Sequence, residues 1–518
     1  MFKLARTQRY TRALAYGLLS VLLLATLTSL SAAQGGGALL VGVNAPVNLD
    51  PASGSNDPEV LFNTLIYDKL FDALPDASIA PNLATGYTVS DDGLIYTVTL
   101  AEGVTFSDGA AFTSADVVFT FNRLVELESP ALSLLSGGSF EIAAPDAATV
   151  VFTLTEPNAD FIYGLAGRFA AILKADSATP NVLAEGDAPY ANFVGTGPFV
   201  LTEYSANQRA MFTRNATYFK PGLPLLDSVE LVFIEDPLAQ IDALRTGAVN
   251  FIFKVPVDQI STLEAEASVT VITRTTNQHP VIRIRADAGA LGEDVRVRQA
   301  FKLATNRDEL NDVLLEGRGT VGNNDPIGPS YGVFYDATLA KPEFDPAAAC
   351  ALISDATGEA RITTDFYVVD SLGYPDLGTV LQQQWAEGCI DVNILVRPEG
   401  VYYSNDEWLS VDLGITGWGD RPIPQSYLTE AYITGGIYNE THWSNAEIDA
   451  LVAEAALTAE TEARAGIYAQ IAQIFADEGP IIIPYYAPVV GATTANVQGL
   501  VLAPFPGLTD LRTVSVTP

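Results

Sequence analysis

The sequence predicts an α/β protein with two lobes, mixed sheets, two hinge crossings and an additional insert domain. Three observations lead to this prediction. Strands alternate with helices through about 280–484, which is typical of an α/β layer. Segments typical of antiparallel strands occupy roughly 77–190. The chain begins with strands and returns to strands at its end, so the first and last strands are expected in the same lobe.

The first elements are predicted from turn residues and hydrophobic periodicity. "ALLVGVNAPVNLDPASGSN" indicates a strand followed by a loop, and "PEVLFNTLIYDKLFDAL" indicates an amphipathic helix. "GYTVSDDGLIYTVTL" predicts a hairpin with its turn at Gly93. Thr113 and Asp116 resemble a capping box at the start of a helix. One face of that helix is expected in the core through Val117, Val118, Phe121 and Leu124.

The later elements follow the same rules. Strands are predicted in "TVVFTLTEP", "FVGTGPFVLTEY", "AMFTRNATYF" and "DSVELVFIED". "PLAQIDALRTGAVNFIF" indicates a helix that ends at Gly247 and precedes a strand. "EDVRVRQAFKLATNRDELNDVLLEG" predicts a pair of helices, and "NAEIDALVAEAALTAETEARAGIYAQIAQIFADEG" predicts two more. Between these pairs, "ITTDFYVVD", "IDVNILVRP" and "VDLGITGWG" are predicted strands, and a helix ending at Gly388 separates the first two.

The order of these elements predicts a discontinuous first lobe. Lobe I is expected to comprise 34–76, 191–279 and 485–518, the insert domain 77–190, and lobe II 280–484. Two connections then join the lobes, one near "NQHPVIRIRAD" and one near "PYYAPVV". A double connection of this kind is what a closing ligand trap needs. The candidate hinge residues are His279, Arg283, Tyr485 and Tyr486.

The composition excludes some partners. The 518 residues include 27 Lys and Arg against 62 Asp and Glu, which gives a net charge of −35. A surface this acidic repels nucleic acid phosphates and anionic lipids, so neither is expected as a partner. The main interpretation of the acidic composition is that it keeps the protein soluble. Attraction of cationic ligands is the alternative.

The N-terminus has the composition and order of a secretory signal, predicted over 1–33 with cleavage after Ala33. Its apolar run is short for a membrane span. Because no cysteine lies near the cleavage site, a lipid anchor is not expected. The mature protein is therefore expected outside the cytoplasm, periplasmic or extracytoplasmic, and soluble. Four cations form the basic start of the segment: Lys3, Arg6, Arg9 and Arg12.

The only two cysteines, Cys350 and Cys389, lie in the exported part of the chain. Cys350 is in the predicted helix "DPAAACALISDA", and Cys389 ends the predicted helix "VLQQQWAEGC". Neighbouring helices of one α/β layer can bring the two sulfurs together, and exported proteins commonly contain disulfides. A Cys350–Cys389 disulfide is predicted, and two unpaired buried thiols are the alternative.

Six segments, in this order, resemble a known family: "LAEGVTFSDGAAFTSADVVFTFNRL", "VGTGPFVLTEY", "RNATYF", "ALRTGAVNF", "DVRVRQAFKLATNRDEL" and "HWSNAEIDALVAEA". They are similar to the extracytoplasmic solute-binding proteins of peptide/nickel-type ABC importers, the dipeptide- and oligopeptide-binding family, over nearly all of the mature chain. The resemblance implies a two-lobed periplasmic-binding-protein fold. It also implies a monomer without a cofactor that captures peptides or a related small polar solute for a membrane permease. Opines, oligosaccharides and metal chelates are alternative solutes within the family.

The resemblance implies that two segments line the ligand cleft. The first is "NLDPASGSN" with Asn48, Asp50 and Ser53, and the second is "TGWGDRPIPQSYL". Many peptide binders have an Asp before a Pro in the second segment, which pairs with the α-ammonium group of the ligand. The spacing here departs from that pattern, because Asp420 precedes Arg421.

The second segment leaves several roles open. Asp420 can bind an ammonium group and Arg421 can hold a carboxylate in a bidentate pair, or the two can neutralise one another. Trp418 is either a flat surface for ligand binding or a core residue. His442 and Trp443 are expected near the rim of the cleft.

For the remaining candidate residues, structural roles are favoured over metal binding or catalysis. For the two histidines, His279 and His442, a structural role is the commoner one. Imidazoles and free thiolates are too few to predict a protein-only metal site. Arg283 and Arg285 alternate along a strand, so only one of them can point into a cleft. The chain has no H-E-x-x-H motif, and neither histidine lies near a convincing Ser–Asp partner in the sequence, so an enzyme is not predicted. A secreted hydrolase that uses paired carboxylates is the remaining alternative.

Overall fold

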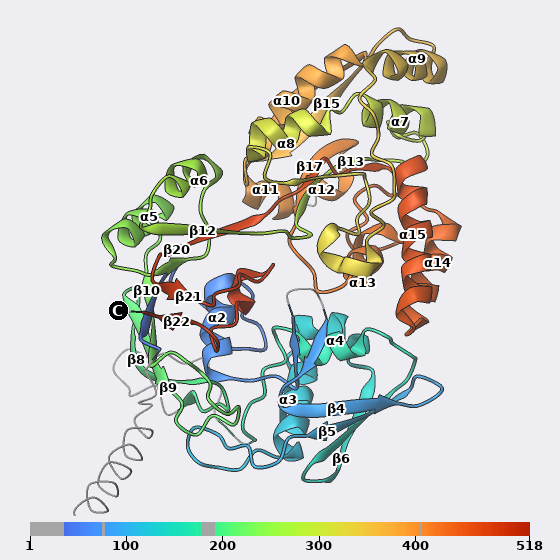
Figure 1. The fold of residues 1–518 in the computed structure, drawn as a ribbon. Coiled ribbons are helices and arrows are strands. Elements are labelled where there is room, and N and C mark those ends of the chain that lie inside the picture. The colour runs from blue at the N-terminus through green and yellow to red at the C-terminus, as the bar shows by residue number, and fades with distance from the viewer. Residues whose placement is uncertain (1–35, 75–77, 176, 178–191, 405–406, 518) are drawn as a thin grey trace, which may run out of the picture.

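The computed structural model describes residues 36–74, 78–175, 177, 192–404 and 407–517. Figure 1 shows two lobes, one above the other, with the chain passing between them near β12 and β20. The predicted signal peptide lies outside the described residues. In the described part of the chain, no helix has both the length and the apolar character needed to cross a membrane.

The lower lobe is built around a seven-stranded mixed sheet with the order β12-β20-β11-β1-β10-β9-β8. β1 pairs in parallel with β10 and β11, and the other neighbours are antiparallel. The late strand β20 lies between β11 and β12, which brings the start and the end of the chain into one sheet, as expected. The strands are β1 (Ala38–Val43), β8 (Phe199–Ser205), β9 (Arg209–Arg214), β10 (Ser228–Phe233), β11 (Phe251–Ile252), β12 (Val269–Arg274) and β20 (Val489–Thr494).

The helices of this lobe are α2 (Asp57–Ile66), α5 (Pro237–Thr246) and α6 (Val257–Glu264). α5 ends as predicted at Gly247, whose φ of 75° lies in the left-handed region that favours glycine. The prediction that the first helix continues to about Leu74 is wrong, because Phe71–Ala73 forms strand β2. The carbonyl of Ile66 accepts a hydrogen bond from the N–H of Gly197, and Tyr67 is already extended. Tertiary hydrogen bonding therefore ends the helix despite its continuing apolar pattern.

The insert domain contains an antiparallel sheet with the order β4-β5-β7-β6. The predicted hairpin forms between β4 and β5, with Gly93 at a φ of 71°. The predicted capping box of α3 is present at Thr113 and Asp116, and the α3 side chain Phe121 packs edge-on against Phe152 of β7. The elements are β3 (Ile79–Pro81), β4 (Ala84–Val89), β5 (Ile95–Leu100), α3 (Ser114–Glu126), η1 (Pro130–Ser133), η2 (Ser136–Gly138), β6 (Phe140–Asp146), β7 (Thr149–Leu154) and α4 (Phe161–Ala166).

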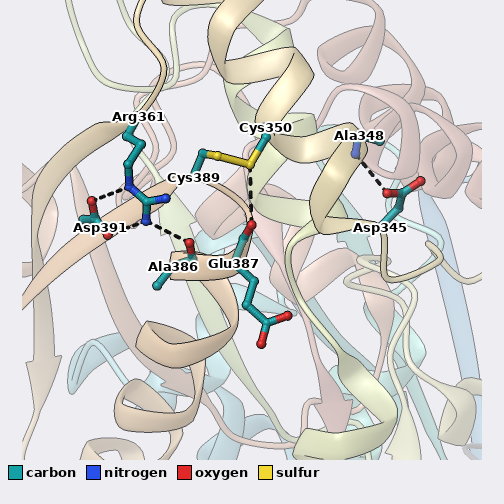
Figure 2. Close-up of a disulfide and its surroundings, with 8 residues drawn as sticks. All are labelled: Asp345, Ala348, Cys350, Arg361, Ala386, Glu387, Cys389 and Asp391. Carbon is teal, nitrogen blue, oxygen red and sulfur yellow. Dashed lines mark hydrogen bonds and ion pairs between the residues drawn. A yellow bond between two sulfur atoms is a disulfide. The ribbon is translucent and has the colours of Figure 1, made fainter.

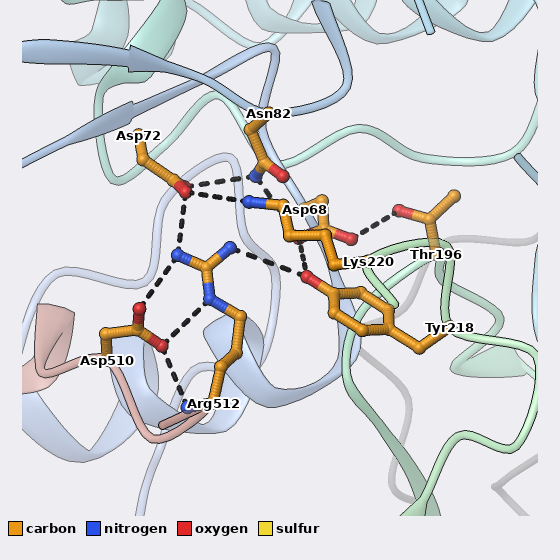
Figure 3. Close-up of polar contacts among 8 residues, drawn as sticks. All are labelled: Asp68, Asp72, Asn82, Thr196, Tyr218, Lys220, Asp510 and Arg512. Carbon is orange, nitrogen blue, oxygen red and sulfur yellow. Dashed lines mark hydrogen bonds and ion pairs between the residues drawn. The ribbon is translucent and has the colours of Figure 1, made fainter. Parts of the chain in front are cut away.

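A network of polar side chains connects the C-terminal segment to the start of the insert (Figure 3). Arg512 donates to Asp72 of β2 at 2.7 Å and to Asp510 at 2.9 Å. Lys220 also pairs with Asp72, and Tyr218 donates to Asp68 at 3.1 Å. The C-terminal elements are β21 (Val497–Gln498), η6 (Pro506–Leu508), which packs on α2, and β22 (Ser515–Val516).

The upper lobe is built around a five-stranded sheet with the order β16-β15-β17-β13-β18. The strands are β13 (His279–Ile284), β15 (Ile362–Val369), β16 (Ile390–Arg397), β17 (Leu413–Trp418) and β18 (Ile481–Ile482). The helices and turns are α7 (Val295–Leu303), α8 (Arg307–Leu315), η4 (Pro329–Phe334), α9 (Pro346–Thr357), α10 (Tyr374–Glu387), α11 (Glu399–Ser404), α12 (Glu407–Ser410), α13 (Pro424–Tyr427), η5 (Leu428–Tyr432), α14 (Ala446–Leu457) and α15 (Thr461–Asp477).

The predicted disulfide is present in this lobe (Figure 2). It joins Cys350 on α9 to Cys389, two residues after the end of α10, with the Cα atoms 5.0 Å apart. Asp345 caps α9 through a hydrogen bond from the N–H of Ala348. The bridge therefore holds the outer helix α9 against the turn between α10 and β16.

Two crossings connect the large sheets. β12 ends at Arg274 in the seven-stranded sheet, and β13 begins at His279 in the five-stranded sheet. On the return, the chain passes from β18 to β20 through β19 (Tyr485–Tyr486), which pairs with β14 (Thr320–Val321). His279, Tyr485 and Tyr486 thus lie at or in the crossings. Arg283 lies further along, inside β13 in the upper lobe. The exact domain boundaries stay a prediction.

Candidate ligand site between the lobes

The loop between β1 and α2 is held together by its own side chains. Asn48 donates to the hydroxyl of Ser53 at 3.0 Å and accepts from the N–H of Asp50 at 3.1 Å. The Asp50 side chain is 7% exposed, and its carboxylate pairs with Arg123 of α3, at 2.9 Å for one of two contacts. Asp50 therefore connects this loop to the insert. Asn48 is half-buried and Ser53 is exposed, and the ligand-binding roles of all three stay a prediction.

The segment after β17 reaches the first crossing. Pro424 starts α13, and the four residues before it are 'DRPI'. The Asp420 carboxylate accepts a hydrogen bond from the N–H of Asn277 at 2.7 Å. Burial raises the pKa of Asp420 to about 6, although that hydrogen bond and the charges of Arg421 and Arg274 oppose the rise. Asp420 and Arg421 form no ion pair among the residues described, so their direct neutralisation is not observed.

Trp418 combines features of both roles considered for it. Its ring is almost buried and meets Tyr427 edge-on at 5.6 Å and Tyr438 at 6.0 Å. The guanidinium of Arg421 lies over the ring, 5.4 Å from its centroid. The indole therefore belongs to the core of the upper lobe and also supports a cation.

His279 is a buried, neutral residue in the first crossing. Its Nδ1 lies 2.6 Å from the carbonyl oxygen of Asn277, which can only accept, so Nδ1 carries the proton. Burial lowers the pKa of His279 to about 4, and the nearby positive charge of Arg421 acts in the same direction. Tyr427 and Tyr486 pack edge-on against the ring. These contacts support a structural role.

Arg283 is fully buried in an ion pair with Glu440, with Nε 2.5 Å from the carboxylate. Arg283 also donates to the hydroxyl of Tyr402 at 2.9 Å, and the hydroxyl of Thr416 donates to Glu440 at 2.8 Å. A small cavity beside this pair is lined by upper-lobe residues, among them Trp418 and Tyr432. The Arg283 side chain therefore lies inside the upper lobe, and its contacts are with residues of that lobe.

His442 and Trp443 contact residues of their own lobe. Nε2 of the partly exposed His442 lies 2.7 Å from the carbonyl oxygen of Leu409, and its Nδ1 lies 3.9 Å from Asp287. Trp443 is buried and packs edge-on against Phe475 at 5.5 Å. Neither contact assigns them to a ligand, so their place at the rim stays a prediction.

Arg168 is a further candidate, and no motif in the sequence indicates it. It follows α4 in the insert, and its guanidinium lies 4.8 Å from the ring of Phe169 and 4.6 Å from that of Phe505. Burial and the positive charge of Arg421 lower the pKa of Arg168 to about 10, while Asp57 opposes the change. The available signal was a single cation within the apolar run "FIYGLAGRFAAIL".

The insert and the upper lobe are in direct contact away from the hinge. Asp160, at the start of α4, pairs with Arg464 of α15 at 2.7 Å, and both side chains are at most 5% exposed. The N–H of Ala159 donates to the carbonyl of Ala456 at 3.0 Å. In Figure 1, α14 and α15 extend downward toward α4. We call the contact formed by Ala159, Asp160, Ala456 and Arg464 the interlobe contact.

Comparisons with known proteins agree with this architecture. The family model of bacterial extracellular solute-binding proteins, family 5, middle part, matches residues 78–440. Heme-binding protein A of Haemophilus influenzae is 25% identical over 89% of this chain and 89% of its own length. Di/tripeptide-binding protein 1 of Pseudomonas aeruginosa is 26% identical over 91% and 93%. The structure of HbpA2 from Haemophilus parasuis superposes with a TM-score of 0.82 at 25% identity, over 93% of this chain and 100% of that one.

Proposed function

Because the chain belongs to family 5 of the bacterial extracellular solute-binding proteins, we propose that it captures peptides or a related small polar solute between its lobes. It then delivers the solute to the permease of an ABC import system. The observation that carries this proposal is the double crossing between two separate sheets, with the Asp420 carboxylate of the upper lobe hydrogen-bonded to the backbone of the first crossing at Asn277. A ligand that contacts both lobes gains its full set of contacts only when they close.

Peptides are the main proposed solute. A relative from Pseudomonas aeruginosa, similar over most of both chains, is named a di/tripeptide-binding protein. A peptide can be held through its backbone and termini, which requires few dedicated side chains. Asp420 is proposed for a ligand ammonium group and Arg421 for a carboxylate.

A non-peptide solute is the second candidate, since another relative is named a heme-binding protein. Among the described residues, no three His, Cys, Asp or Glu side chains are grouped so that they could hold a metal ion. A bound metal would therefore be held through an organic shell. The same proposal includes export to the periplasm or another extracytoplasmic compartment, a soluble monomer without a lipid anchor, and no catalysis of its own.

Native mass spectrometry tests the function directly. Protein purified from an exported fraction is expected to carry a small solute, which appears as a defined mass increment lost on mild denaturation. Calorimetry with di-, tri- and tetra-alanine then measures affinity, and peptide and glycoside turnover is assayed in parallel. Turnover of either substrate, or no bound solute together with no peptide binding, would contradict the proposed peptide-binding function.

A further inference from the structure

The first crossing is bonded to the upper lobe through both the backbone and the side chain of Asn277. The N–H of Asn277 donates to the Asp420 carboxylate at 2.7 Å, and its carbonyl oxygen accepts from the hydroxyl of Tyr427 at 3.2 Å. The same carbonyl oxygen lies 2.6 Å from Nδ1 of His279, and the side-chain oxygen accepts from the N–H of Ser330 at 2.9 Å. Because Asn277 is only 1% exposed, water does not compete for these bonds, and the residue is fixed to the upper lobe.

The two crossings are also bonded to each other. The hydroxyl of the buried Thr276 donates to the carbonyl of Ala487 at 2.7 Å, and the N–H of Ala487 donates to the carbonyl of Gln278 at 2.9 Å. Just before Ala487, Tyr486 lies in β19, which pairs with β14, and its hydroxyl donates to the carbonyl of Asp325. Both crossings are therefore attached to the upper lobe over most of their length.

The attachment to the upper lobe begins at the same level on both crossings. The ladder between β12 and β20 in the lower lobe ends where Arg274 faces Val489. The next residues toward the upper lobe are Thr275 and Pro488, which this register places opposite each other. The carbonyl of Thr275 already accepts a hydrogen bond from the hydroxyl of Ser330 in the upper lobe, at 2.9 Å. Thr275 and Pro488 thus each join a residue of the lower sheet to a segment attached to the upper lobe.

We propose that the lobes move by bending at Thr275 and Pro488, while Asn277 and the rest of both crossings move with the upper lobe. A few residues of this kind absorb the changes in φ and ψ when two lobes rotate. The segment after β17 supplies part of the attachment through Asp420 and Tyr427, so it acts on the hinge as well as on any solute. The purpose of the motion rests on the proposed solute-binding function, but the bending itself is measured without a solute.

Double electron–electron resonance on ligand-free protein tests the position of the hinge. Spin labels at Leu238→Cys on α5 and Val313→Cys on α8, both exposed positions, report the distance between the lobes. Thr275→Gly and Pro488→Gly should each broaden the distance distribution, on the order of twofold, because glycine reaches positive φ about as readily as negative φ. Gln278→Gly is the matched control. It lies in the same crossing as Thr275 but inside the attached part, so it should leave the distribution unchanged.

Equal broadening by Gln278→Gly would spread the bending over the whole crossing and overturn the inference, and so would unchanged distributions in Thr275→Gly and Pro488→Gly. Failure of trialanine to bind would instead reject the peptide function and leave these distance measurements unaffected.

A second comparison tests the attachment. In the triple variant Asp420→Ala/Tyr427→Phe/Gln278→Gly, Asn277 loses its bonds to the segment after β17, so the glycine should now broaden the distribution. An unchanged distribution would overturn the role of that segment in the hinge. Circular dichroism establishes that the variants are folded, and Tyr427→Phe/Gln278→Gly replaces the triple variant if the latter is not.

Discussion

Asp420 and His279 lie at the first crossing, and burial moves their pKa values in opposite directions. The pKa of Asp420 rises to about 6, whereas an unfolded Asp titrates near 3.9. Between these values the folded state holds more protons, so this group's contribution to stability falls as the pH rises. The pKa of His279 falls to about 4, against roughly 6.5 when unfolded. Its contribution therefore falls as the pH drops, and the two groups oppose each other from about pH 4 to 6.

Asp420→Asn should reveal the pH dependence that His279 gives to the free energy of unfolding. Asparagine still accepts the hydrogen bond from Asn277 but does not titrate, so the part that decreases with rising pH is removed. Between pH 4 and 6 the free energy of unfolding of the variant should gain about 1–2 kcal/mol relative to wild type, a value discounted for partial exposure. Urea unfolding at several pH values measures this. Asp91→Asn, in an exposed turn, is the control, and parallel profiles for Asp420→Asn and wild type would contradict the prediction.

The buried pair of Arg283 and Glu440 makes a second prediction at this scale. Arg283→Met leaves the Glu440 carboxylate buried and without its cation, which should cost about 3–5 kcal/mol of unfolding free energy. The double variant Arg283→Met/Glu440→Gln should recover much of this loss, because no uncompensated charge remains. Urea unfolding of both variants at pH 7 gives the comparison. A single variant within about 1 kcal/mol of wild type would show that the pair is not a structural unit.

Individual residues mark the limits of prediction from sequence for the candidate site. Trp418, Asp420 and Arg421 could be identified as candidates from the sequence, because one recognisable segment contains all three. Arg168 could not be, since its contact with Phe505 depends on how two distant parts of the chain meet. Asp50 illustrates the same limit: its type and position suggested a ligand contact, but the fold places Arg123 against it. Sequence gives the chemistry of a side chain, and tertiary contacts determine whether that chemistry is available.

At the scale of elements, local signals located the starts of α3 and α9 and the end of α5, but not the end of α2. Thr113 and Asp345 precede α3 and α9 as predicted, because a cap is formed by residues adjacent in sequence. The end of α2 was mispredicted because its competing hydrogen bond comes from Gly197, far away in the chain. The strands of the second crossing are only two residues long in β18 and β19, too short for a period-2 pattern.

The disulfide is the element-scale feature with the clearest energetic consequence. It closes a segment with a sequence separation of 39 residues. Loss of this constraint in the double variant Cys350→Ser/Cys389→Ser should lower the free energy of unfolding by about 4 kcal/mol in the chain-entropy model. Urea unfolding checks this, and reduced wild-type protein should behave like the variant. Two alkylated thiols in native protein, measured by intact mass without reductant, would contradict the bridge itself.

At the scale of the whole molecule, the return of the chain to its first lobe was predictable because strands occur at both ends of the sequence. The interlobe contact was not, since Asp160 and Arg464 are 304 residues apart and their neighbouring sequence gives no sign of pairing. This contact lies at the far side of the lobes from the double crossing and joins the insert to α15. We therefore expect it to favour a closed arrangement of the lobes even without a ligand, and we expect the proposed solute to add contacts to both lobes.

Arg464→Gln tests how much the interlobe contact and the ligand each contribute to the population of the closed form. Without the ion pair, the open form should become more populated, so the radius of gyration of ligand-free protein should rise in small-angle scattering. Saturating trialanine should lower the radius again while circular dichroism stays constant. A smaller closed population weakens every solute alike, so affinity for trialanine and for its amide should fall by the same factor, on the order of tenfold. Arg361→Gln is the control, and a radius unchanged in Arg464→Gln would leave the crossings and the solute as the only determinants of closure.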